Sequence, residues 1–487
     1  MTVDMDFLVR ILGGVAVGAP LLLVVLLGSM RLLSRPLTER FVGRSVQVAV
    51  VTGLIAALLT LALMLLSGTR RLTLDLGGWV ALGHDYHFAL KIEFDRLSVP
   101  FAILSFVLCG TIGAFANIYM HREAGYHRFF VLYSLFVLGM IVTSLAGTIE
   151  TLFMGWEIVG LSSAALVAFY HERPGPVANG LKVWIVYRIG DAALLLASVV
   201  LHHVTKTGDF DQIFGSVAWP EVHLEPLTRA TGAAAGQEVG QWNALLIGML
   251  LLVAAAGKSA MIPFSGWLPR AMEGPTPSSA VFYGALSVHL GAFLLLRVSP
   301  ILDYCPPVAI AALLCGLTSA AFAALVGRAQ TDIKSSLSYA SITQVGIIFA
   351  EIGLGSLIPH EPTRYAIRYF ALLHILGHGC LRTLQFLRAP SLLHDYKILE
   401  NAIGDRLAAQ DRQATPPRTD RMRWRLYRFA LERGYLDAVL SDFVVTPFLA
   451  LFRWCDRMER RWTDFLAGPQ KPRDSSQEAI ASLEEML

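Results

Sequence analysis

The sequence predicts an all-α polytopic membrane protein, a bundle of about 11–12 transmembrane helices. Of its 487 residues, 55% are hydrophobic and only 16% are charged, whereas about a quarter of a typical soluble domain is charged. No soluble core could bury so much apolar sequence, so composition alone places the chain in a membrane. The net charge of +3 is too small to indicate a nucleic-acid partner.

Apolar runs of the length that crosses a bilayer, about 20 residues, recur along the chain. The first run lacks a small-residue cleavage site after it, so we expect a retained first helix and not a removed signal peptide. A twelfth, weaker apolar stretch covers residues 436–454. The eleven predicted spans are residues 8–30, 46–67, 98–118, 129–146, 150–170, 183–203, 243–264, 278–297, 307–327, 333–354 and 365–387.

Basic residues gather in alternate loops, and such loops face the cytoplasm in most membrane proteins. The loop after the first span holds Arg31, Arg35, Arg40 and Arg44, and residues 391–434 are also rich in arginine and lysine. This pattern predicts a multi-pass protein of the bacterial inner membrane, with its N-terminus outside and residues 391–434 in the cytoplasm.

Three regions are expected along the chain. Residues 1–390 form the transmembrane domain, with a short extramembrane hairpin at 70–96 because Leu72–Leu74 and Phe88–Ile92 alternate as strands do. Residues 391–434 form a basic linker, or a docking surface for a partner or for anionic membrane lipid. Residues 435–487 are predicted as an apolar or amphipathic helix followed by a tail.

The five cysteines are scattered and include no C-x-x-C pair. This excludes a cysteine-ligated zinc or iron–sulfur site and a disulfide framework. We expect no metal and no cofactor in this chain.

Two charged residues lie deep inside predicted spans, where ionisable groups are costly and usually functional. Glu157 is at the middle of span 150–170, and Lys258 is flanked by apolar sequence in span 243–264. A lysine in a dry interior responds to a nearby carboxylate, so the two residues predict a site that loads and releases protons. The alternatives are a neutral acid packed in its helix and a lysine that extends to one surface.

Pro263 follows Lys258 by five residues. Because proline removes a backbone hydrogen bond, we expect the helix to break between Lys258 and Pro263. Broken helices beside ion sites recur in transporters.

Polar residues also share faces on two other spans. Arg188 and Asp191 are spaced i, i+3 and can pair, either structurally or to tune the site. His374, His378 and Arg382 are spaced i, i+4, i+8, which makes one polar stripe. Histidine suits a proton relay because it titrates near neutral pH, although bonding to neighbouring helices is the alternative, and Arg382 can only set the local potential.

The other charged residues are interpreted from their positions along the predicted spans. His289 fits a relay and a hydrogen-bonded core histidine equally well. Asp332 is expected to favour the start of its helix, beside Lys334. Solvation at the membrane interface is the expectation for residues near span ends, which are Glu150, His202, His203, Arg297 and Glu351.

At these residues the sequence resembles the antiporter-like family that includes the L subunit of respiratory NADH–quinone oxidoreductase and the large Mrp-type sodium/proton antiporter subunits. The resemblance covers roughly residues 90–390. The matching stretches, in family order, are Gly155–Ser163, Arg188–Asp191, Gly257–Ala260, Trp267–Pro277, Thr331–Lys334, and His374 with His378.

The resemblance implies that Glu157 and Lys258 form the paired proton-handling site, and that His374 and His378 belong to a central polar axis. With the other polar residues, the predicted proton-translocation set is Glu157, Arg188, Asp191, Lys258, His289, Lys334, His374, His378 and Arg382. The sequence departs from the family at Tyr283, where a histidine is usual, and at Arg382, where a lysine is usual. It also lacks the family's second broken helix, so we expect a truncated second inverted repeat.

The departures, with the Phe282–His289 variant, look like the membrane subunit of Dab-type inorganic-carbon transporters. That resemblance implies a non-enzymatic subunit whose proton flux energises CO2 capture as bicarbonate. Its partner would be a large cytoplasmic zinc-containing, carbonic-anhydrase-like subunit, which would hold all the catalytic chemistry.

Three rival functions stay open. The first is a proton-pumping subunit of an NADH–quinone oxidoreductase-like complex, and the second is a sodium/proton antiporter subunit, because the residues do not distinguish H+ from Na+. The third is a passive scaffold that anchors a soluble enzyme through residues 391–434.

Overall fold

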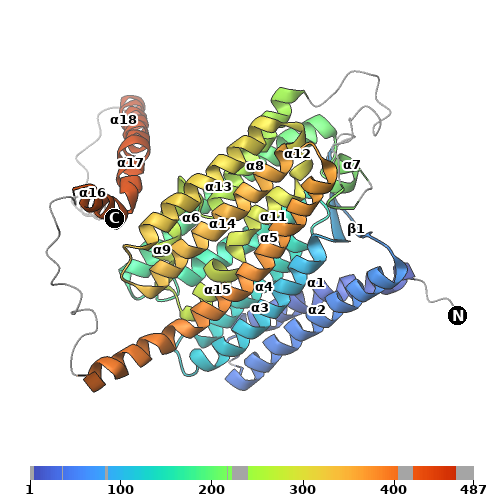
Figure 1. Ribbon diagram of the computed structural model, residues 1–487, viewed down its shortest axis with the longest axis horizontal. Helices are drawn as coiled ribbons and strands as arrows, with labels where there is room; N and C mark the ends of the chain where they lie inside the picture. The colour runs from blue at the N-terminus through green and yellow to red at the C-terminus, as the bar shows by residue number, and fades with distance from the viewer. Residues whose placement is uncertain are drawn as a thin grey trace. The chain divides into compact units, whose positions relative to one another are not determined.

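A computed structural model describes residues 5–35, 37–82, 86–215, 218–221, 240–403 and 421–467. The chain divides into two compact units, Met1–Leu431 and Glu432–Leu487, and each is described by itself. The first unit is a bundle of long helices, in which α1 and α2 lie side by side at one edge (Figure 1).

The predicted helical membrane protein is confirmed, since ten helices of the described residues are long and apolar enough to cross a bilayer. Nine of them are continuous, and the tenth is an interrupted segment, Thr276–Arg297. The nine are α1 (Met5–Leu32), α2 (Glu39–Ser67), α3 (Ser98–Tyr119), α4 (Tyr126–Ser144), α5 (Ile149–Val167), α6 (Pro174–Thr205), α8 (Gln241–Lys258), α13 (Pro306–Gly327) and α14 (Ile333–Leu357).

The eleventh predicted span, 365–387, lies inside α15 (Glu361–Ile403), a helix of 43 residues. It is not among the ten because the polar stripe of two histidines and Arg382 lowers its mean hydropathy. The twelfth, weaker stretch, 436–454, is not one continuous helix. It is divided among α17 (Leu436–Leu440), a π-helix at Ser441–Val445, and the start of α18 (Thr446–Ala467).

The helix break at Lys258–Pro263 is present. Helix α8 ends at Lys258, six residues before the predicted end of its span, and Ala260 follows in the left-handed region with φ of 56°. Short helices continue the chain at Phe264–Gly266, Trp267–Arg270 (α9) and Ala271–Glu273.

A second break, which the sequence reading missed, interrupts the predicted span 278–297. Its parts are α10 (Thr276–Ser279), a π-helix at Ala280–Ala285, a 3-10 turn at Ser287–His289 and α11 (Leu290–Arg297). α12 (Ser299–Tyr304) follows directly. The break places His289 at the turn between two helical pieces, not on a regular helix face.

The predicted extramembrane hairpin is also present. Strands β1 (Arg71–Leu82) and β2 (Tyr86–Asp95) pair antiparallel, with Arg71 opposite Asp95. The backbone of β2 bonds the turn between α4 and α5, where Glu93 N–H donates to the Leu145 carbonyl at 2.7 Å. A short helix, α7 (Phe210–Phe214), packs nearby. The hairpin is therefore fixed to one end of the bundle.

The C-terminal helices expose both basic and apolar side chains. α16 (Arg421–Leu431) lies in the predicted basic segment, and α18 exposes large apolar side chains over its whole length. Those with more than half of their area exposed are Phe448, Leu451, Phe452, Trp454, Trp462, Phe465 and Leu466. Alternation of these residues with Arg453, Arg457 and Arg460 makes α18 strongly amphipathic.

Candidate functional site

A cluster of four charged residues lies between α5, α6 and α8; we call Glu157, Arg188, Asp191 and Lys258 the carboxylate–lysine cluster. Lys258 is 1% exposed, and its ammonium group donates to the Trp156 carbonyl at 3.0 Å. Its carboxylate neighbour is Asp191, with 4.0 Å between Nζ and Oδ1. A buried amine thus has one acceptor and one counter-charge.

Asp191 connects the members of this cluster. Its Oδ1 accepts a hydrogen bond from Trp156 Nε1 at 2.7 Å, and its Oδ2 lies 2.6 Å from Nη2 of Arg188. The same Nη2 atom of Arg188 bonds the carboxylate of Glu157. The structure therefore brings Arg188 and Asp191 together as their spacing predicts.

Glu157 and Lys258 are not a direct ion pair in the part of the chain that the structure describes. Asp191 lies at the ammonium group of Lys258, and Arg188 bonds the Glu157 carboxylate, so the two predicted residues belong to one cluster through these intermediates. The sequence placed Asp191 only in a side-by-side pair with Arg188. Nothing in the spacing revealed that α6 inserts between α5 and α8.

Aromatic rings and a glycine form the rest of the chamber around Lys258. Its Nζ lies 4.3 Å from the centre of the Tyr187 ring and 4.9 Å from that of Trp156, distances at which rings stabilise cations. A Cβ atom on Gly160 would lie 2.9 Å from Nζ, so a side chain there would require the amine to shift. Trp156 and Tyr187 were missed as site residues, although Trp156 precedes Glu157 in the matching motif.

A second group of polar residues lies on α15 and its neighbours; we call His289, His374, His378 and Arg382 the histidine axis. His289 Nε2 is 2.9 Å from His378 Nδ1, and both residues are buried. Arg382 Nε donates to His378 Nε2 at 3.4 Å. The stripe predicted on one helix face therefore continues to the helix break that carries His289.

Two residues of α14 extend this axis. His374 Nδ1 lies 2.9 Å from Glu351 Oε1, and its Nε2 lies 3.0 Å from Gln344 Oε1. Glu351 was expected to be solvated at the membrane interface, whereas its half-buried carboxylate bonds His374. Gln344 was missed since an uncharged amide inside an apolar span gives no distinct signal.

Three other residues expected at the interface form pairs. His202 is 3% exposed, where interfacial solvation was expected, and its Nδ1 lies 2.9 Å from Oε1 of Glu150, which is half-buried. Arg297 is 5% exposed and pairs with Asp95. His203 is exposed, as expected. Sequence position near a span end does not distinguish a hydrated residue from one covered by a hairpin.

Lys334 is the one predicted site residue that no contact joins to the others among the described residues. It is half-buried at the second position of α14. Asp332 caps that helix as expected, accepting from Ser335 N–H at 2.7 Å. The side chain of Tyr283 falls outside the described residues.

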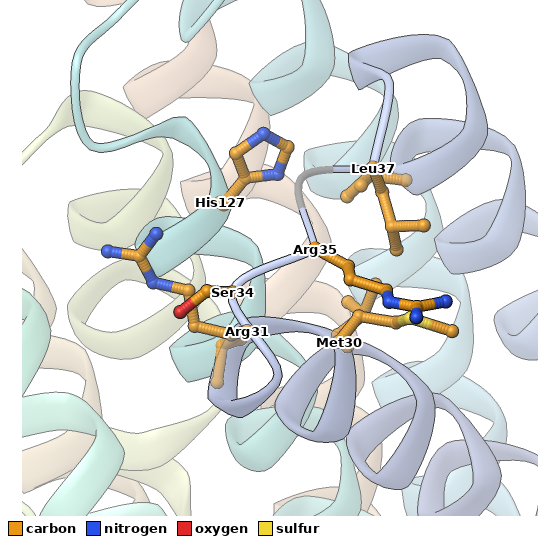
Figure 2. Close-up of a pocket in the computed structure, with 9 residues that line it drawn as sticks. Met30, Arg31, Ser34, Arg35, Leu37 and His127 are labelled. Carbon is orange, nitrogen blue, oxygen red and sulfur yellow. The ribbon is translucent and has the colours of Figure 1, made fainter.

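The site is a file of side chains. A cavity of about 440 Å³ lies elsewhere, between α1, α2 and α4, and Arg31, Arg35 and His127 line it (Figure 2). In the described ranges no three histidine, cysteine, aspartate or glutamate residues gather as metal ligands. The arrangement fits transfer of protons between fixed groups.

Solved structures share this fold. The Mrp complex of Dietzia sp. DQ12-45-1b aligns with a TM-score of 0.61 at 24% identity, over 83% of this chain and 38% of that chain. The membrane-bound sulfane sulfur reductase, an archaeal respiratory membrane complex, aligns with a TM-score of 0.59 at 17% identity, over 77% and 70%.

Sequence relatives point the same way. Subunit L of NADH-quinone oxidoreductase from Rhodobacter capsulatus is 33% identical over 314 residues, which cover 62% of this chain and 41% of that protein. Chain 5 of NADH-ubiquinone oxidoreductase from Schizophyllum commune is 32% identical over 324 residues, 66% of this chain and 43% of that protein. The chain spans less than half the length of both relatives.

Family profiles match the region that carries the site. A profile for the N-terminus of NADH-ubiquinone oxidoreductase (complex I) chain 5 matches residues 79–130. The profile for the transmembrane part of NADH:quinone oxidoreductase and Mrp antiporter subunits matches residues 146–406, more than half of the chain. The protein therefore belongs to the NADH:quinone oxidoreductase/Mrp antiporter transmembrane family.

Proposed function

We propose that this chain is a proton-translocating membrane subunit in which protons pass between the carboxylate–lysine cluster and the histidine axis. The observation that supports this is Lys258, a 1% exposed amine inside a membrane bundle with Asp191 at 4.0 Å. Ionisable groups are costly there and mark ion pathways. A passive scaffold would not require them.

The cluster works as an electrostatic relay with Asp191 at its centre. When Arg188 turns fully toward Glu157, the Asp191 carboxylate is left to stabilise the protonated Lys258. When Arg188 turns to Asp191, or a proton neutralises that carboxylate, the ammonium group loses its counter-charge and releases its proton. Removing one partner of a buried pair costs about 3–5 kcal/mol, comparable with the ~2.3 kcal/mol that a proton releases in crossing 100 mV.

The proton released by Lys258 goes toward His289. Ser259, the next residue after Lys258, donates to the Val288 carbonyl at 2.6 Å, and Val288 precedes His289. His289 then contacts His378 at 2.9 Å. The break after α8 and the break at His289 therefore adjoin, and backbone groups freed by both are available along this route.

The relay is tested by Lys258→Ala in the full chain, reconstituted into vesicles with an imposed proton gradient. We expect proton movement to be abolished because Lys258 is the amine that lies at Asp191 among the described residues. The matched control is Lys182→Ala, an exposed lysine on the neighbouring helix α6, which should move protons as the unchanged chain does. Normal movement in the Lys258 variant would contradict the relay.

The proposal extends to a partner, a large cytoplasmic zinc-containing, carbonic-anhydrase-like subunit, with proton flux driving CO2 capture as bicarbonate. Two features support this: the Phe282–His289 motif, which looks like that of the Dab-type membrane subunit, and the exposed apolar face of α18, which fits a protein surface. The zinc chemistry belongs to the partner.

The partner is identified by purifying the chain under mild conditions and determining what accompanies it. We expect a zinc-containing soluble protein, and inorganic-carbon uptake that requires both components and Lys258. Copurification with a quinone-reducing complex would instead favour the respiratory alternative. A sodium-dependent pH change in vesicles would favour the antiporter alternative.

A further inference from the structure

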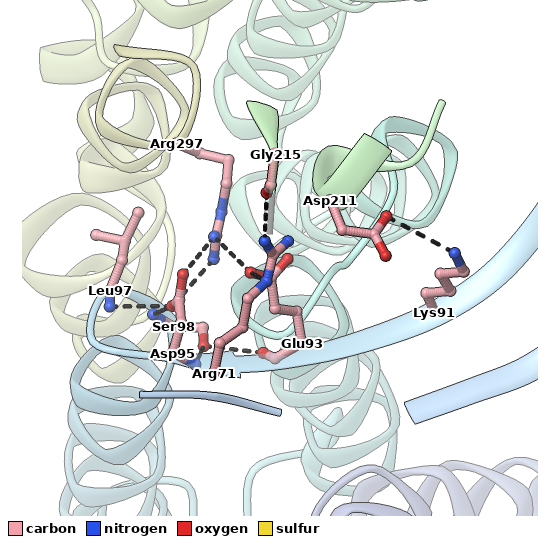
Figure 3. Close-up of polar contacts among 9 residues, drawn as sticks. All are labelled: Arg71, Lys91, Glu93, Asp95, Leu97, Ser98, Asp211, Gly215 and Arg297. Carbon is pink, nitrogen blue, oxygen red and sulfur yellow. Dashed lines mark hydrogen bonds and ion pairs between the residues drawn. The ribbon is translucent and has the colours of Figure 1, made fainter. Parts of the chain in front are cut away.

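Four charged side chains meet at the base of the hairpin, apart from the two groups already described; we call them the hairpin cluster. They are Arg71 on β1, Glu93 and Asp95 on β2, and Arg297 at the end of α11 (Figure 3). Glu93 is 2% exposed, Asp95 1% and Arg297 5%. The cluster has two cations and two carboxylates, which balance only while both carboxylates are ionised.

Both carboxylate oxygens of Asp95 accept hydrogen bonds. Its Oδ1 accepts from the backbone N–H groups of Leu97 at 3.0 Å and Ser98 at 2.7 Å, and its Oδ2 accepts from Arg297 Nη1 at 2.6 Å. Burial raises the pKa of Asp95, but the Arg297 charge and these hydrogen bonds outweigh it and hold the pKa below its usual value. Asp95 therefore stays ionised.

Glu93 has an unused oxygen. Its Oε1 lies 2.9 Å from Arg71 Nε and 3.5 Å from Arg297 Nη1, whereas its buried Oε2 has no hydrogen-bond partner among the described residues. Burial raises the pKa of Glu93 to about 7 with help from Asp95, against the lowering by the two arginines. Protonated and ionised forms of this acid are both populated near neutral pH.

Among the described residues, no charged side chain other than Arg71 and Arg297 forms an ion pair with Glu93. Lys91, two residues earlier on β2, is held by Asp209 and lies 3.7 Å from Asp211 on α7. Arg71 is further fixed by donating to the Gly215 carbonyl at 2.7 Å. From the α4–α5 turn, the contact with Glu93 is the Leu145 backbone carbonyl.

The cluster borders two hollows on the hairpin side. A cavity of about 10 Å³ is lined by all four charged residues together with Phe210, Phe214 and Trp219, which is room for about one water molecule. Asp95 also lines a larger, open hollow of about 530 Å³ with Arg96 and Tyr369. Exchange of a proton between Glu93 and the hairpin-side solution would pass through these two hollows.

The cluster also lies within electrostatic reach of the histidine axis. Arg297 follows His289 by eight residues on the same interrupted segment, about 12 Å along a helix. The turns between them are apolar, with Phe293 stacked on Phe101 at 4.7 Å, so the two sites communicate by charge and not by a hydrogen-bonded chain. A unit charge about 12 Å away changes an equilibrium by about tenfold at an effective dielectric constant of ~20, and Glu93 lies beside Arg297, with 3.5 Å between Oε1 and Nη1.

We propose that Glu93 is a second proton-binding site, open to the hairpin side, whose charge controls how readily a proton is held at His289 and His378. The inference rests on the proposed function, because the controlled step is the arrival of protons on that axis. A proton on Glu93 changes the cluster from neutral to +1 and repels the next proton. The site thereby slows translocation when the hairpin-side solution is acidic.

Infrared difference spectra of the full chain in lipid vesicles test the site directly. Acidification through pH 7 should produce the carbonyl band of a protonated carboxylic acid, and Glu93→Gln should remove it. Glu221→Gln, at a half-exposed acid on the same side, should keep it. Glu93→Asp, which retains an acid, should keep a band at a shifted pH if the glutamine variant does not fold. A band that survives in the folded glutamine variant, or that titrates below pH 5, overturns the proposal.

Proton flux measured in the same vesicles tests whether the charge on Glu93 regulates translocation. The unchanged chain should lose flux by about tenfold as the hairpin-side pH falls through 7, from the charge effect above. Glu93→Gln is permanently neutral and should show, at every pH, the reduced flux of the acidified unchanged chain. A flux that still depends on pH in this variant would overturn the proposal that Glu93 regulates translocation. Failure of the proposed function would give a different result, because Lys258→Ala would then leave proton flux unchanged. The infrared titration would still show whether Glu93 binds a proton near pH 7.

Discussion

At the scale of single residues, Asp191 decides how the cluster works. Its two oxygens serve different partners, Arg188 on one side and both Trp156 and Lys258 on the other. Arg188 is in turn shared with Glu157. In the proposed relay, this single carboxylate between two cations converts a movement of the arginine into a change in the stability of the ammonium group.

Asp191→Asn should therefore be more damaging than Glu157→Gln. The asparagine leaves the fully buried Lys258 without its counter-charge, a loss of about 3–5 kcal/mol for buried pairs, whereas Arg188 can still bond Asp191 when Glu157 is neutral. We expect loss of proton movement and a lower unfolding temperature for Asp191→Asn, and partial proton movement with near-normal unfolding for Glu157→Gln. Equal effects of the two substitutions would contradict the central role of Asp191.

Glu93 makes stability depend on pH in a defined direction. Because burial raises its pKa from 4.5 to about 7, the folded state binds this proton more tightly than the unfolded state. The contribution is fully present below about pH 4.5 and is lost as pH rises through about 7, an effect of about 3 kcal/mol.

The unfolding temperature measured from about pH 5 to about pH 8 checks this sign. We expect it to fall more steeply in the unchanged chain than in Glu93→Gln, which cannot ionise. Glu221→Gln should retain the full pH dependence. Parallel curves for all three proteins would show that Glu93 does not titrate in this range.

At the scale of elements, glycines set how closely α13 and α14 pack. A Cβ atom on Gly346 would lie 2.7 Å from the Gly316 carbonyl oxygen and 2.9 Å from the Ala320 nitrogen. Both are backbone atoms, which cannot turn aside as a side chain can. Small residues at such crossings are how membrane helices approach one another without a hydrophobic driving force.

Gly346→Ala should consequently separate α13 from α14 and destabilise the bundle by about 1–3 kcal/mol, the usual effect of overpacking. Thermal unfolding in detergent measures the change. Gly18→Ala on α1 is the matched control, because nothing lies within 4 Å of a Cβ atom there. An unfolding temperature as high as that of the control would indicate that the two helices can separate with no loss of stability.

At the scale of the whole molecule, charge predicts the orientation. Ser34 is exposed in the arginine-rich turn between α1 and α2, and Leu76 is exposed on the hairpin. If the basic turns face the cytoplasm, the hairpin cluster and its open hollow face the outside. That orientation is the one in which Glu93 senses external pH.

Labelling with a membrane-impermeant thiol reagent tests this orientation. In a background without the five native cysteines, Leu76→Cys should react from outside intact cells, and Ser34→Cys only after the cytoplasmic side is opened. The reverse order would invert the orientation and would place Glu93 on the cytoplasmic side.

The sequence by itself determined the membrane class, the positions of ten spanning helices, the hairpin and the break after Lys258. Each follows from local properties, namely run length, hydropathy, strand alternation and proline chemistry. The intramembrane charges were found for the same reason, since a charged residue in an apolar run is visible without any partner.

Only the tertiary structure decided which charges meet. It placed Asp191 between Arg188 and Lys258, gave His374 its partner Glu351, and buried Arg297 against Glu93 and Asp95. Burial near a span end and pairing across helices depend on how separate segments pack, and hydropathy along one chain does not record that packing. The second helix break at His289 belongs here too, because no proline or glycine pattern at that turn distinguishes it from a continuous span.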